Sequence, residues 1–288
     1  MINTFYVKKK YSDNEFKNNE GTYFGESHYN KIYKKGDIDV FWKDDNGGEK
    51  ILFKIRRGVI PKDMHNKIRE IYEPFVKKGD NKHNQGFISD ISKKYGYRSS
   101  KSKISGYFDK SYQQLNKHFE TINVCRTTSF TRDNFEEWKK AIPFFERIGK
   151  IYKELAPEHH RKQCSLFKHC PPGMRIGRTP FTTITTNYNW RTACHKDRGD
   201  YRLGMGNLTV LGDNTFEGGY LGFPQFKVAV DVRPGDTVIM DVHQWHCNTE
   251  LDANENRVRL SFVSYFREKM VNCNKKKVIN GETFWHKS

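Results

Sequence analysis

The sequence predicts an α+β protein whose core is a jelly roll. Between residues 181 and 266 the chain breaks into short runs rich in β-forming side chains, and glycine-rich turns separate these runs. Before residue 157, three stretches instead indicate helices. Many short strands joined by such turns are typical of a β-sandwich or barrel, for which a jelly roll is the obvious candidate. Helices and a hairpin are expected to flank this core.

The expected elements divide the 288 residues into four parts. Residues 1–35 are rich in Lys, Asn and Tyr and show little apolar periodicity, which predicts a basic, loosely packed N-terminal arm. Residues 36–175 are expected to hold a hairpin, a basic loop and helices that pack on the core. Residues 176–273 should form the jelly-roll core, and residues 274–288 a C-terminal tail.

A hairpin and a helix are expected directly after the arm. Residues 37–42 and 50–55 alternate polar and apolar side chains on either side of a turn near Asn46, as the strands of a β-hairpin do. Pro61 then begins the first helical stretch. Residues 79–105 follow as a long basic loop, and loops of that length are usually functional or disordered.

Two more helical stretches follow the basic loop, and the second of them leads to the core. Asp133 precedes Glu136 in the arrangement of a capping box, which predicts the start of a helix. Apolar residues then recur at helical spacing until Pro157, which is expected to end the helix. The strands of the core should follow at residues 181–188, 206–211, 226–232, 236–241 and 257–266.

The charge balance predicts a polyanionic partner. Lys and Arg number 51 against 34 Asp and Glu, which gives a formal net charge of +17. Nucleic acid, most simply DNA, accounts for this charge better than an acidic membrane surface. No stretch approaches the ~20 apolar residues of a membrane span, and no signal peptide is recognisable. We expect an intracellular protein with no membrane contact and no implied protein partner, and its subcellular address stays open.

The six cysteines stand at positions 125, 164, 170, 194, 247 and 273. They are scattered along the chain and form no CxxC pair, so the pattern favours neither a disulfide framework nor a structural zinc site. We therefore expect all six to be reduced thiols.

A candidate metal site begins at the exit of the first predicted core strand. His195 and Asp197 are two residues apart, so their side chains point the same way if the backbone is extended. His246, after a later strand, would complete the two-histidine, one-carboxylate triad that leaves positions open on iron(II). His243 competes for the third position, and we prefer His246.

An oxygenase that uses 2-oxoglutarate also needs a cation for the distal carboxylate of this cosubstrate. Arginine suits the task because its planar guanidinium binds a carboxylate through two hydrogen bonds. Arg257 and Arg259 lie on one face of the last predicted strand, and the spacing favours neither. Arg191 is a weaker candidate for a second contact with the cosubstrate.

From these residues outward the sequence resembles the TET/JBP family of 2-oxoglutarate oxygenases. An ordered set of motifs is more specific than any single one, and here the set covers most of the chain from about residue 50 to residue 273. The arm before residue 35 lies outside it. Weaker similarity is found at residues 57–61 and 105–109. The motifs themselves lie at residues 182–200, 206–211, 218–224, 234–249 and 259–268.

The resemblance implies a double-stranded β-helix oxygenase core that uses iron(II), 2-oxoglutarate and O2. By this resemblance His195, Asp197 and His246 would bind iron, and Arg259 would bind 2-oxoglutarate. The residues implied to contact the nucleic-acid base are Asp200, Tyr265 and Arg267, and some family members have a histidine at the last of these positions. In the basic loop, Arg98 and Lys101 are candidate contacts with the nucleic-acid backbone.

The resemblance also predicts the reaction, which is oxidation of the 5-methyl group of a pyrimidine base. We choose 5-methylcytosine in DNA as the substrate, with 5-hydroxymethylcytosine as the first product and further oxidation open. Thymine, or a 5-methylpyrimidine in RNA, is the alternative within the family. An inactive module that binds modified DNA is the alternative from another class of function.

Overall fold

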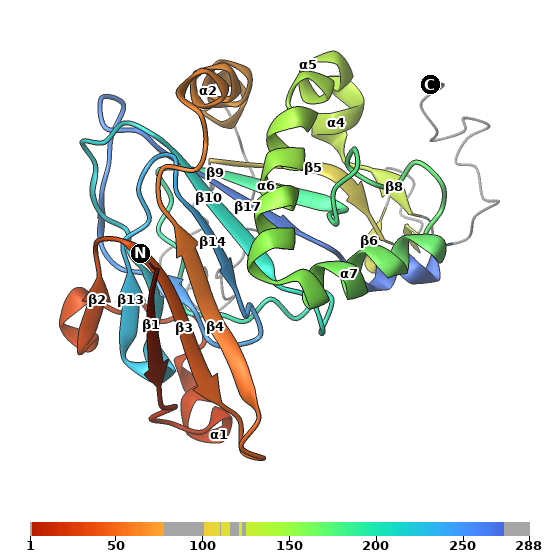
Figure 1. Cartoon of the computed structure of the whole chain (residues 1–288). Helices are drawn as coiled ribbons and strands as arrows, with labels where there is room; N and C mark the ends of the chain where they lie inside the picture. Colours follow the sequence, from red (N-terminus) through yellow and green to blue (C-terminus); the bar gives the residue numbers. More distant parts are fainter. Residues whose placement is uncertain (1, 78–100, 110, 116–120, 123–124, 274–288) are drawn as a thin grey trace. The chain divides into compact units, whose positions relative to one another are not determined.

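The computed structural model describes most of the chain, and Figure 1 shows its elements coloured along the sequence. The described residues are 2–77, 101–109, 111–115, 121–122 and 125–273. The chain divides into two compact units, which are described separately. Unit 1 comprises residues 1–103, 186–198 and 206–262, and unit 2 comprises residues 104–185, 199–205 and 263–288. The domain boundaries predicted at residues 35, 175 and 273 stay predictions.

In the described part of the chain, unit 1 contains two larger β-sheets and a two-stranded sheet of β11 and β16. In one, the strand order is β1-β3-β4-β14-β10-β17-β9, and in the other it is β15-β12-β13-β2. The elements in or entering this unit are β1 (Ile2–Val7), α1 (Asp13–Phe16), β2 (Lys31–Tyr33), β3 (Asp37–Lys43), β4 (Glu49–Arg56), α2 (Lys62–Lys77), β9 (Thr183–Tyr188), β10 (Gly206–Gly212), β11 (Glu217–Gly218), β12 (Leu221–Phe223), β13 (Val228–Val230), β14 (Thr237–Met240), β15 (Cys247–Asn248), β16 (Leu251–Asp252) and β17 (Arg259–Tyr265).

Aromatic side chains join the two larger sheets of unit 1. The predicted hairpin of β3 and β4 is confirmed, and its strands pair antiparallel. Its alternation buries one face, on which Phe53 stacks against Phe223 of the other sheet with ring centroids 5.4 Å apart. Trp42 meets Phe226 edge to face at 5.4 Å. Full burial of one such ring contributes about 1.5–3 kcal/mol, so these contacts are a major part of the core.

The first 35 residues are packed, contrary to the loose arm that we expected. Strand β1 pairs parallel with β3, and β2 pairs parallel with β13. Ser12 caps α1 through a capping box with Glu15, and the ring of Phe16 in the same helix is buried. The few apolar side chains of this segment are inserted singly into unit 1, and isolated insertions leave no periodic pattern in a sequence.

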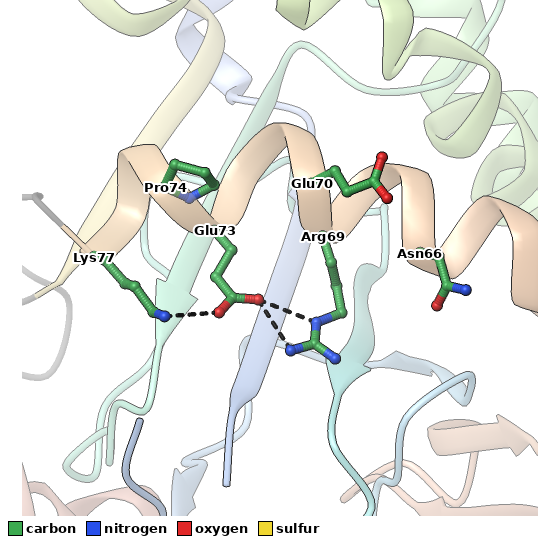
Figure 2. Close-up of a pocket in the computed structure, with 6 residues that line it drawn as sticks. All are labelled: Asn66, Arg69, Glu70, Glu73, Pro74 and Lys77. Carbon is green, nitrogen blue, oxygen red and sulfur yellow. Dashed lines mark hydrogen bonds and ion pairs between the residues drawn. The ribbon is translucent and has the colours of Figure 1, made fainter. Parts of the chain in front are cut away.

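Helix α2 confirms the helix predicted after Pro61, and it is strongly amphipathic. Four of its apolar residues, Ile68, Ile71, Tyr72 and Val76, are buried, whereas its polar face carries a ladder of ion pairs. Glu73 accepts from Arg69 at 3.0 Å and from Lys77 at 2.9 Å, each one helical turn away (Figure 2). Arg69 also binds Asp213 at 2.7 Å, which fastens the helix to the end of β10. A hollow of about 520 Å³ lies along this face.

Unit 2 contains helices and a smaller set of strands. Strand β9 meets β5 through a hydrogen bond from the Tyr107 amide to the Thr182 carbonyl at 2.8 Å, and β5 pairs antiparallel with β8. None of the helices in the described part of the chain combines the length and apolar character needed to cross a membrane. The elements in or entering unit 2, besides β9 and β17, are β5 (Ser102–Phe108), β6 (Ser111–Leu115), β7 (Thr121–Ile122), β8 (Arg126–Thr127), α4 (Ser129–Asp133), α5 (Phe135–Lys140), α6 (Ile142–Leu155) and α7 (Pro157–Ser165).

The predicted start of the helical stretch is wrong, whereas its predicted end is right. Asp133 ends α4 instead of capping a helix, and the cap of α4 is Thr128, whose hydroxyl accepts from the Thr131 amide. The predicted end of the second stretch is confirmed, because α6 ends at Leu155, and Pro157 occupies the first turn of the next helix, α7. Proline lacks an N–H group and is therefore tolerated at the first position of a helix. A proline in a helical pattern can thus mark the end of one helix and the start of the next.

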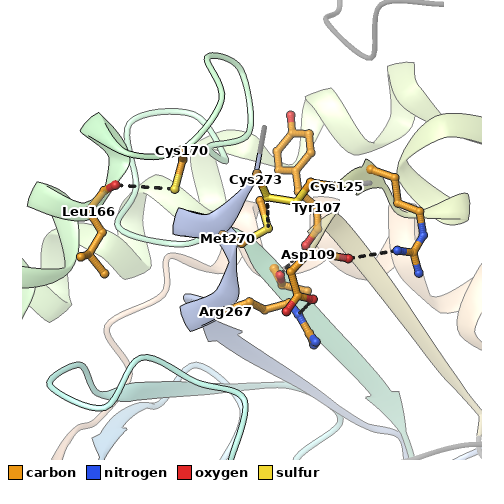
Figure 3. Close-up of a disulfide and its surroundings, with 10 residues drawn as sticks. Tyr107, Asp109, Cys125, Leu166, Cys170, Arg267, Met270 and Cys273 are labelled. Atoms are coloured by element: carbon orange, nitrogen blue, oxygen red, sulfur yellow. Dashed lines mark hydrogen bonds and ion pairs between the residues drawn. A yellow bond between two sulfur atoms is a disulfide. The ribbon is translucent and has the colours of Figure 1, made fainter. Parts of the chain in front are cut away.

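The expectation of six reduced thiols is also wrong. Cys125 and Cys273 form a disulfide in unit 2, with Cα atoms 5.7 Å apart (Figure 3). The Cys273 sulfur also contacts Met270, whose side chain is buried. The two cysteines are 148 positions apart, and nothing in their local sequence indicates that they pair. The four other cysteines are free thiols.

Reduction of this disulfide is expected to destabilise the protein by about 2–5 kcal/mol, because the crosslink closes a long loop and restricts the unfolded chain. Urea unfolding of wild type and of a Cys125→Ser variant, each with and without reductant, measures the effect. Reductant should shift the wild-type midpoint toward that of the variant and leave the variant unchanged. A wild-type midpoint that does not respond to reductant would contradict the disulfide.

Candidate metal centre and cosubstrate site

The structure brings His195, Asp197 and His246 together inside unit 1. His195 and His246 face each other across an antiparallel bridge, with an N–H to O=C hydrogen bond of 3.0 Å in each direction. Their ring centroids are 4.3 Å apart. The Asp197 amide donates to the Val242 carbonyl at 3.0 Å, which holds the carboxylate beside both rings. Backbone pairing between distant segments therefore positions all three side chains.

The second nitrogen of each imidazole is held by the backbone. Nδ1 of His195 lies 2.9 Å from the Ala193 carbonyl oxygen, and Nδ1 of His246 lies 3.0 Å from that of Gln244. Each Nδ1 therefore donates its proton to a backbone carbonyl, and each Nε2 faces Asp197 as the nitrogen available to a metal once it carries no proton. The distances from Nε2 to the carboxylate are 3.4 Å for His195 and 3.6 Å for His246.

Burial and mutual charge set the protonation of this cluster. Burial, with the neighbouring charge of His195, lowers the pKa of His246 to about 4, so this imidazole is neutral near pH 7. Burial would raise the pKa of Asp197, but His195 overrides it and holds the carboxyl ionised. Burial alone would lower the pKa of His195, but the charge and hydrogen bond of Asp197 outweigh burial and raise this pKa. A neutral imidazole and an ionised carboxylate are the forms that bind metals.

The donor set fits iron(II). One ligand atom from each of the three residues lies within 4.8 Å of the others, and all three side chains are buried. Two imidazoles and one carboxylate form the facial triad of non-haem iron(II) oxygenases, which leaves coordination positions open. His243, the competitor for the third place, is outside this group in the described part of the chain. The assignment of these residues as iron ligands remains our proposal.

Arg259 is a buried cation with unused donors. Its side chain lies on β17 and is 2% exposed. Nε and Nη2 have no hydrogen-bond partner among the residues that the structure describes. Burial lowers its pKa to about 10, against the attraction of Asp231, so the guanidinium stays charged near pH 7. The backbone of Gly219, with φ +66°, lies beside this guanidinium. A Cβ added at Gly219 would lie 3.5 Å from Nε of Arg259. Two unpartnered donors on a buried cation fit a carboxylate ligand.

The two other candidate arginines have protein partners. Arg257 binds Asp252 at 2.6 Å, and its side chain is 34% exposed. Arg191 donates to Glu250 at 2.9 Å and to the Phe24 carbonyl at 3.3 Å. Neither guanidinium offers the buried, open donors found at Arg259, so we retain Arg259 alone as the candidate for 2-oxoglutarate.

The three residues predicted to contact the base lie in unit 2, and each contacts other residues of that unit. Asp200 is buried and bridges to Arg267 through the backbone. Tyr265 is buried, and its hydroxyl lies 3.1 Å from that of Thr185. Arg267 Nε donates to Asp109 at 2.8 Å, as Figure 3 shows. Their role toward a base remains a proposal.

Asp109 is a residue of this site that the sequence analysis did not assign. Its carboxylate is buried and orients Arg267, whose guanidinium also lies 5.0 Å from the ring centroid of Phe108. Residues 105–109 showed only weak similarity to the family, and that was the available signal. Of the two proposed backbone contacts, Arg98 lies outside the described residues. Lys101 is exposed, and its Nζ lies 5.5 Å from the Tyr188 ring centroid.

Comparison with known proteins identifies the family. Residues 103–268 match the Tet_JBP family model, described as the oxygenase domain of the 2OGFeDO superfamily. Thymine dioxygenase JBP1 of Trypanosoma brucei brucei is 36% identical over 176 residues, which is 60% of this chain and 20% of that protein. The bifunctional helicase and thymine dioxygenase JBP2 of Leishmania braziliensis is 30% identical over 231 residues, 79% of this chain and 19% of that protein. The chain thus spans about a fifth of the length of these relatives.

The fold agrees with this match. NgTET1, solved in complex with 5mC DNA, superposes with a TM-score of 0.58 at 15% identity and covers 85% of each chain. This likeness confirms the predicted α+β class with an oxygenase double-stranded β-helix. The cofactors of the superfamily are iron(II), 2-oxoglutarate and O2, as predicted from the motifs. Because the family model covers more than half of the 288 residues, the chain belongs to the Tet/JBP family of oxygenases in the 2OGFeDO superfamily.

Proposed function

We propose that this protein is an iron(II)- and 2-oxoglutarate-dependent dioxygenase that hydroxylates the 5-methyl group of thymine in DNA. The observation that carries the proposal is the buried His195, Asp197 and His246 cluster in a chain with the unpartnered Arg259. An acidic or basic surface alone would fit many functions. A facial triad together with a buried carboxylate receptor fits a narrow class of oxygenases.

The residues of the site have two tasks: to bind iron(II) and 2-oxoglutarate, and to exclude bulk water. His195 and His246 would bind iron(II) through Nε2, and Asp197 through one carboxylate oxygen. When bound, iron(II), 2-oxoglutarate and O2 supply the oxidation, in which one oxygen atom enters the methyl group and the other enters succinate as CO2 leaves. Arg259 would receive the distal carboxylate of 2-oxoglutarate. The burial of all four side chains keeps bulk water away from the reacting groups.

The base is the part of our prediction that changes. The sequence favoured 5-methylcytosine, with thymine as the alternative. Both relatives named above are thymine dioxygenases, and the likeness to NgTET1 at 15% identity concerns the fold alone. Thymine is therefore the better-supported substrate, and 5-methylcytosine remains the alternative that the experiment below tests.

The polar groups of unit 2 are chemically compatible with thymine. Thymine presents an N–H donor at N3 and a carbonyl acceptor at O4, where 5-methylcytosine presents an amino donor. A carboxylate such as Asp200 can accept from the N3 proton. Arg267 can only donate, so it suits a carbonyl oxygen better than an amino group. A histidine at this position, as in some family members, can do either.

DNA as the substrate is consistent with the charge of the chain. A formal net charge of +17 favours binding to phosphates, and such binding weakens as salt rises, because releasing counterions into a saltier solution gains less free energy. The methyl group of a paired thymine lies in the major groove, so an enzyme that acts on it must extrude the nucleotide from the helix. Extrusion costs a few kcal/mol, which contacts with the flanking phosphates must offset.

The test is a competition within one duplex that contains equal numbers of thymine and 5-methylcytosine. The protein is incubated with iron(II), 2-oxoglutarate and ascorbate under ¹⁸O2, beside an Asp197→Ala control, and the nucleosides are analysed by mass spectrometry. We expect 5-hydroxymethyluracil that carries ¹⁸O, with wild type only. The isotope separates enzymatic hydroxylation from oxidative damage during handling.

Each other result has a definite meaning. Labelled 5-hydroxymethylcytosine without labelled 5-hydroxymethyluracil would replace thymine by 5-methylcytosine. Succinate formation with neither product would retain the oxygenase and direct the search to RNA. No consumption of 2-oxoglutarate with either nucleic acid would overturn the proposal in favour of a binding module.

A further inference from the structure

Asp200 and Arg267 are direct neighbours in unit 2. They form an antiparallel bridge. The residues on either side of this bridge are joined by backbone hydrogen bonds of 2.8 Å and 3.0 Å, and none joins Asp200 to Arg267. This is the pattern of a closely spaced, non-hydrogen-bonded pair, whose side chains point to the same face. A hydrogen-bond acceptor and a hydrogen-bond donor therefore stand next to each other.

An acceptor beside a donor matches both candidate bases, but in opposite order. At positions 3 and 4 of the ring, thymine presents an N–H donor and then a carbonyl acceptor. At the same two positions 5-methylcytosine presents a nitrogen acceptor and then an amino donor. Asp200, when ionised, only accepts, and Arg267 only donates. The two side chains select one base over the other only if Arg267 is confined to one of the two positions.

Arg267 is confined by contacts along its length. An arginine side chain has several rotatable bonds, so a free one could reach either position. Here the Arg267 amide donates to the Thr182 hydroxyl at 3.0 Å, and Nε donates to the Asp109 carboxylate at 2.8 Å (Figure 3). The guanidinium also lies 5.0 Å from the ring centroid of Phe108. Because Asp109 occupies Nε, Arg267 can contact a base only through its terminal nitrogens.

Asp109 is itself firmly placed. It directly follows β5, which pairs with β8 through Phe108 and Arg126. The Arg126 guanidinium donates to the Asp109 backbone carbonyl at 3.0 Å and lies 5.3 Å from the Phe108 ring centroid. The side chain of Asp109 is 6% exposed, whereas that of Arg267 is 27% exposed. The carboxylate is thus a buried, strand-anchored support for a guanidinium that still reaches the surface.

We propose that Asp109 is a positioning residue that determines which base the enzyme selects, because it holds the Arg267 guanidinium at position 4 and leaves position 3 to Asp200. This inference rests on the proposed function, which assigns both side chains to the base and thymine as the substrate. Asp109 acts through Arg267 and does not touch the base. Without Asp109, Arg267 can also donate to the position-3 nitrogen of 5-methylcytosine, and the selection is lost.

The test measures affinity without turnover. The full chain, with Mn(II) and 2-oxoglutarate, is titrated into two fluorescein-labelled single strands that differ only in one central base, thymine or 5-methylcytosine. A single strand removes the cost of extrusion. Wild type should prefer thymine by about 5- to 150-fold, the range for a specific contact with a base edge. Asp109→Ala should bind both strands with similar affinity. Asp109→Asn keeps a neutral acceptor for Nε and should retain an intermediate preference.

A double-mutant cycle separates positioning from direct contact. Arg267→Met removes the donor and should lose the preference for thymine. If Asp109 acts through Arg267, adding Asp109→Ala to Arg267→Met should not change the affinity ratio further. The double variant also leaves neither charge of the pair without its partner, so it guards against a loss of fold in Asp109→Ala alone.

The matched control is Asp39→Asn, which alters another shielded carboxylate that binds an arginine, Arg56, at 2.7 Å. It should keep the wild-type affinity ratio. The inference is overturned if wild type does not prefer thymine, if Asp109→Ala keeps the wild-type ratio, or if Asp109→Ala still changes the ratio in the Arg267→Met background. Failure of the proposed function is a different result, because it appears as the absence of hydroxylated nucleoside in the competition with wild type.

Discussion

Replacing His246 with alanine is expected to abolish iron binding and base oxidation together, whereas His243→Ala should leave both intact. The His246→Ala variant lacks one of the three candidate protein ligands. The lost imidazole places its Nε2 3.6 Å from the Asp197 carboxylate. The metal supplies all of the oxidative chemistry in this class of enzyme, so we expect turnover to fall by at least about three orders of magnitude. His243 is outside the cluster in the described part of the chain.

The measurement has two readouts that do not depend on each other. Iron content after anaerobic loading and gel filtration reports the ligand role directly. Hydroxylated nucleoside reports turnover. His246→Ala should retain less than a tenth of the wild-type iron, and His243→Ala should retain all of it. Equal iron contents in the two variants would remove His246 from the metal site, even if both were inactive.

The sequence pointed to these candidate ligands because part of the pattern is local. His195 and Asp197 are two positions apart, and the preference for His246 rested on the residues that follow it. The support of the site was not predictable in this way. The Cys194 amide donates to the Thr22 carbonyl at 2.8 Å, and the Gly21 amide donates to the Cys194 carbonyl at 2.7 Å. The N-terminal segment thus holds the backbone next to His195.

Similar reasoning explains which elements of the fold were predictable. The hairpin of β3 and β4 and helix α2 have periodic burial, so their patterns could be recognised. Strand β1 is mostly exposed, so its sequence shows no alternation of buried apolar residues. The disulfide joins residues 148 positions apart and depends on the final packing of unit 2. Contacts of that range leave no local signature.

Replacing Arg259 with methionine is expected to weaken 2-oxoglutarate binding roughly 30- to 5,000-fold without loss of iron. Removal of one member of a buried, hydrogen-bonded charge pair costs about 2–5 kcal/mol, and each 1.4 kcal/mol corresponds to about a factor of ten. Calorimetry with Mn(II) in place of iron(II) measures the dissociation constant without turnover. Arg257→Met is the matched control, because Arg257 is paired with Asp252 and partly exposed.

Thermal unfolding separates this role from a structural one. A buried guanidinium with unpartnered donors is costly to the ligand-free protein, so Arg259→Met should not lower the ligand-free Tm. Wild type should gain about 2.7 kcal/mol of stability at 2-oxoglutarate concentrations 100 times the Kd, and Arg259→Met should gain less than about 1 kcal/mol at the same concentration. If the variant instead lost ligand-free stability and kept its response to 2-oxoglutarate, Arg259 would be a core residue, and the carboxylate receptor would have to be sought elsewhere. A buried cation that stabilises the protein only when its ligand is present is best explained as part of a binding site.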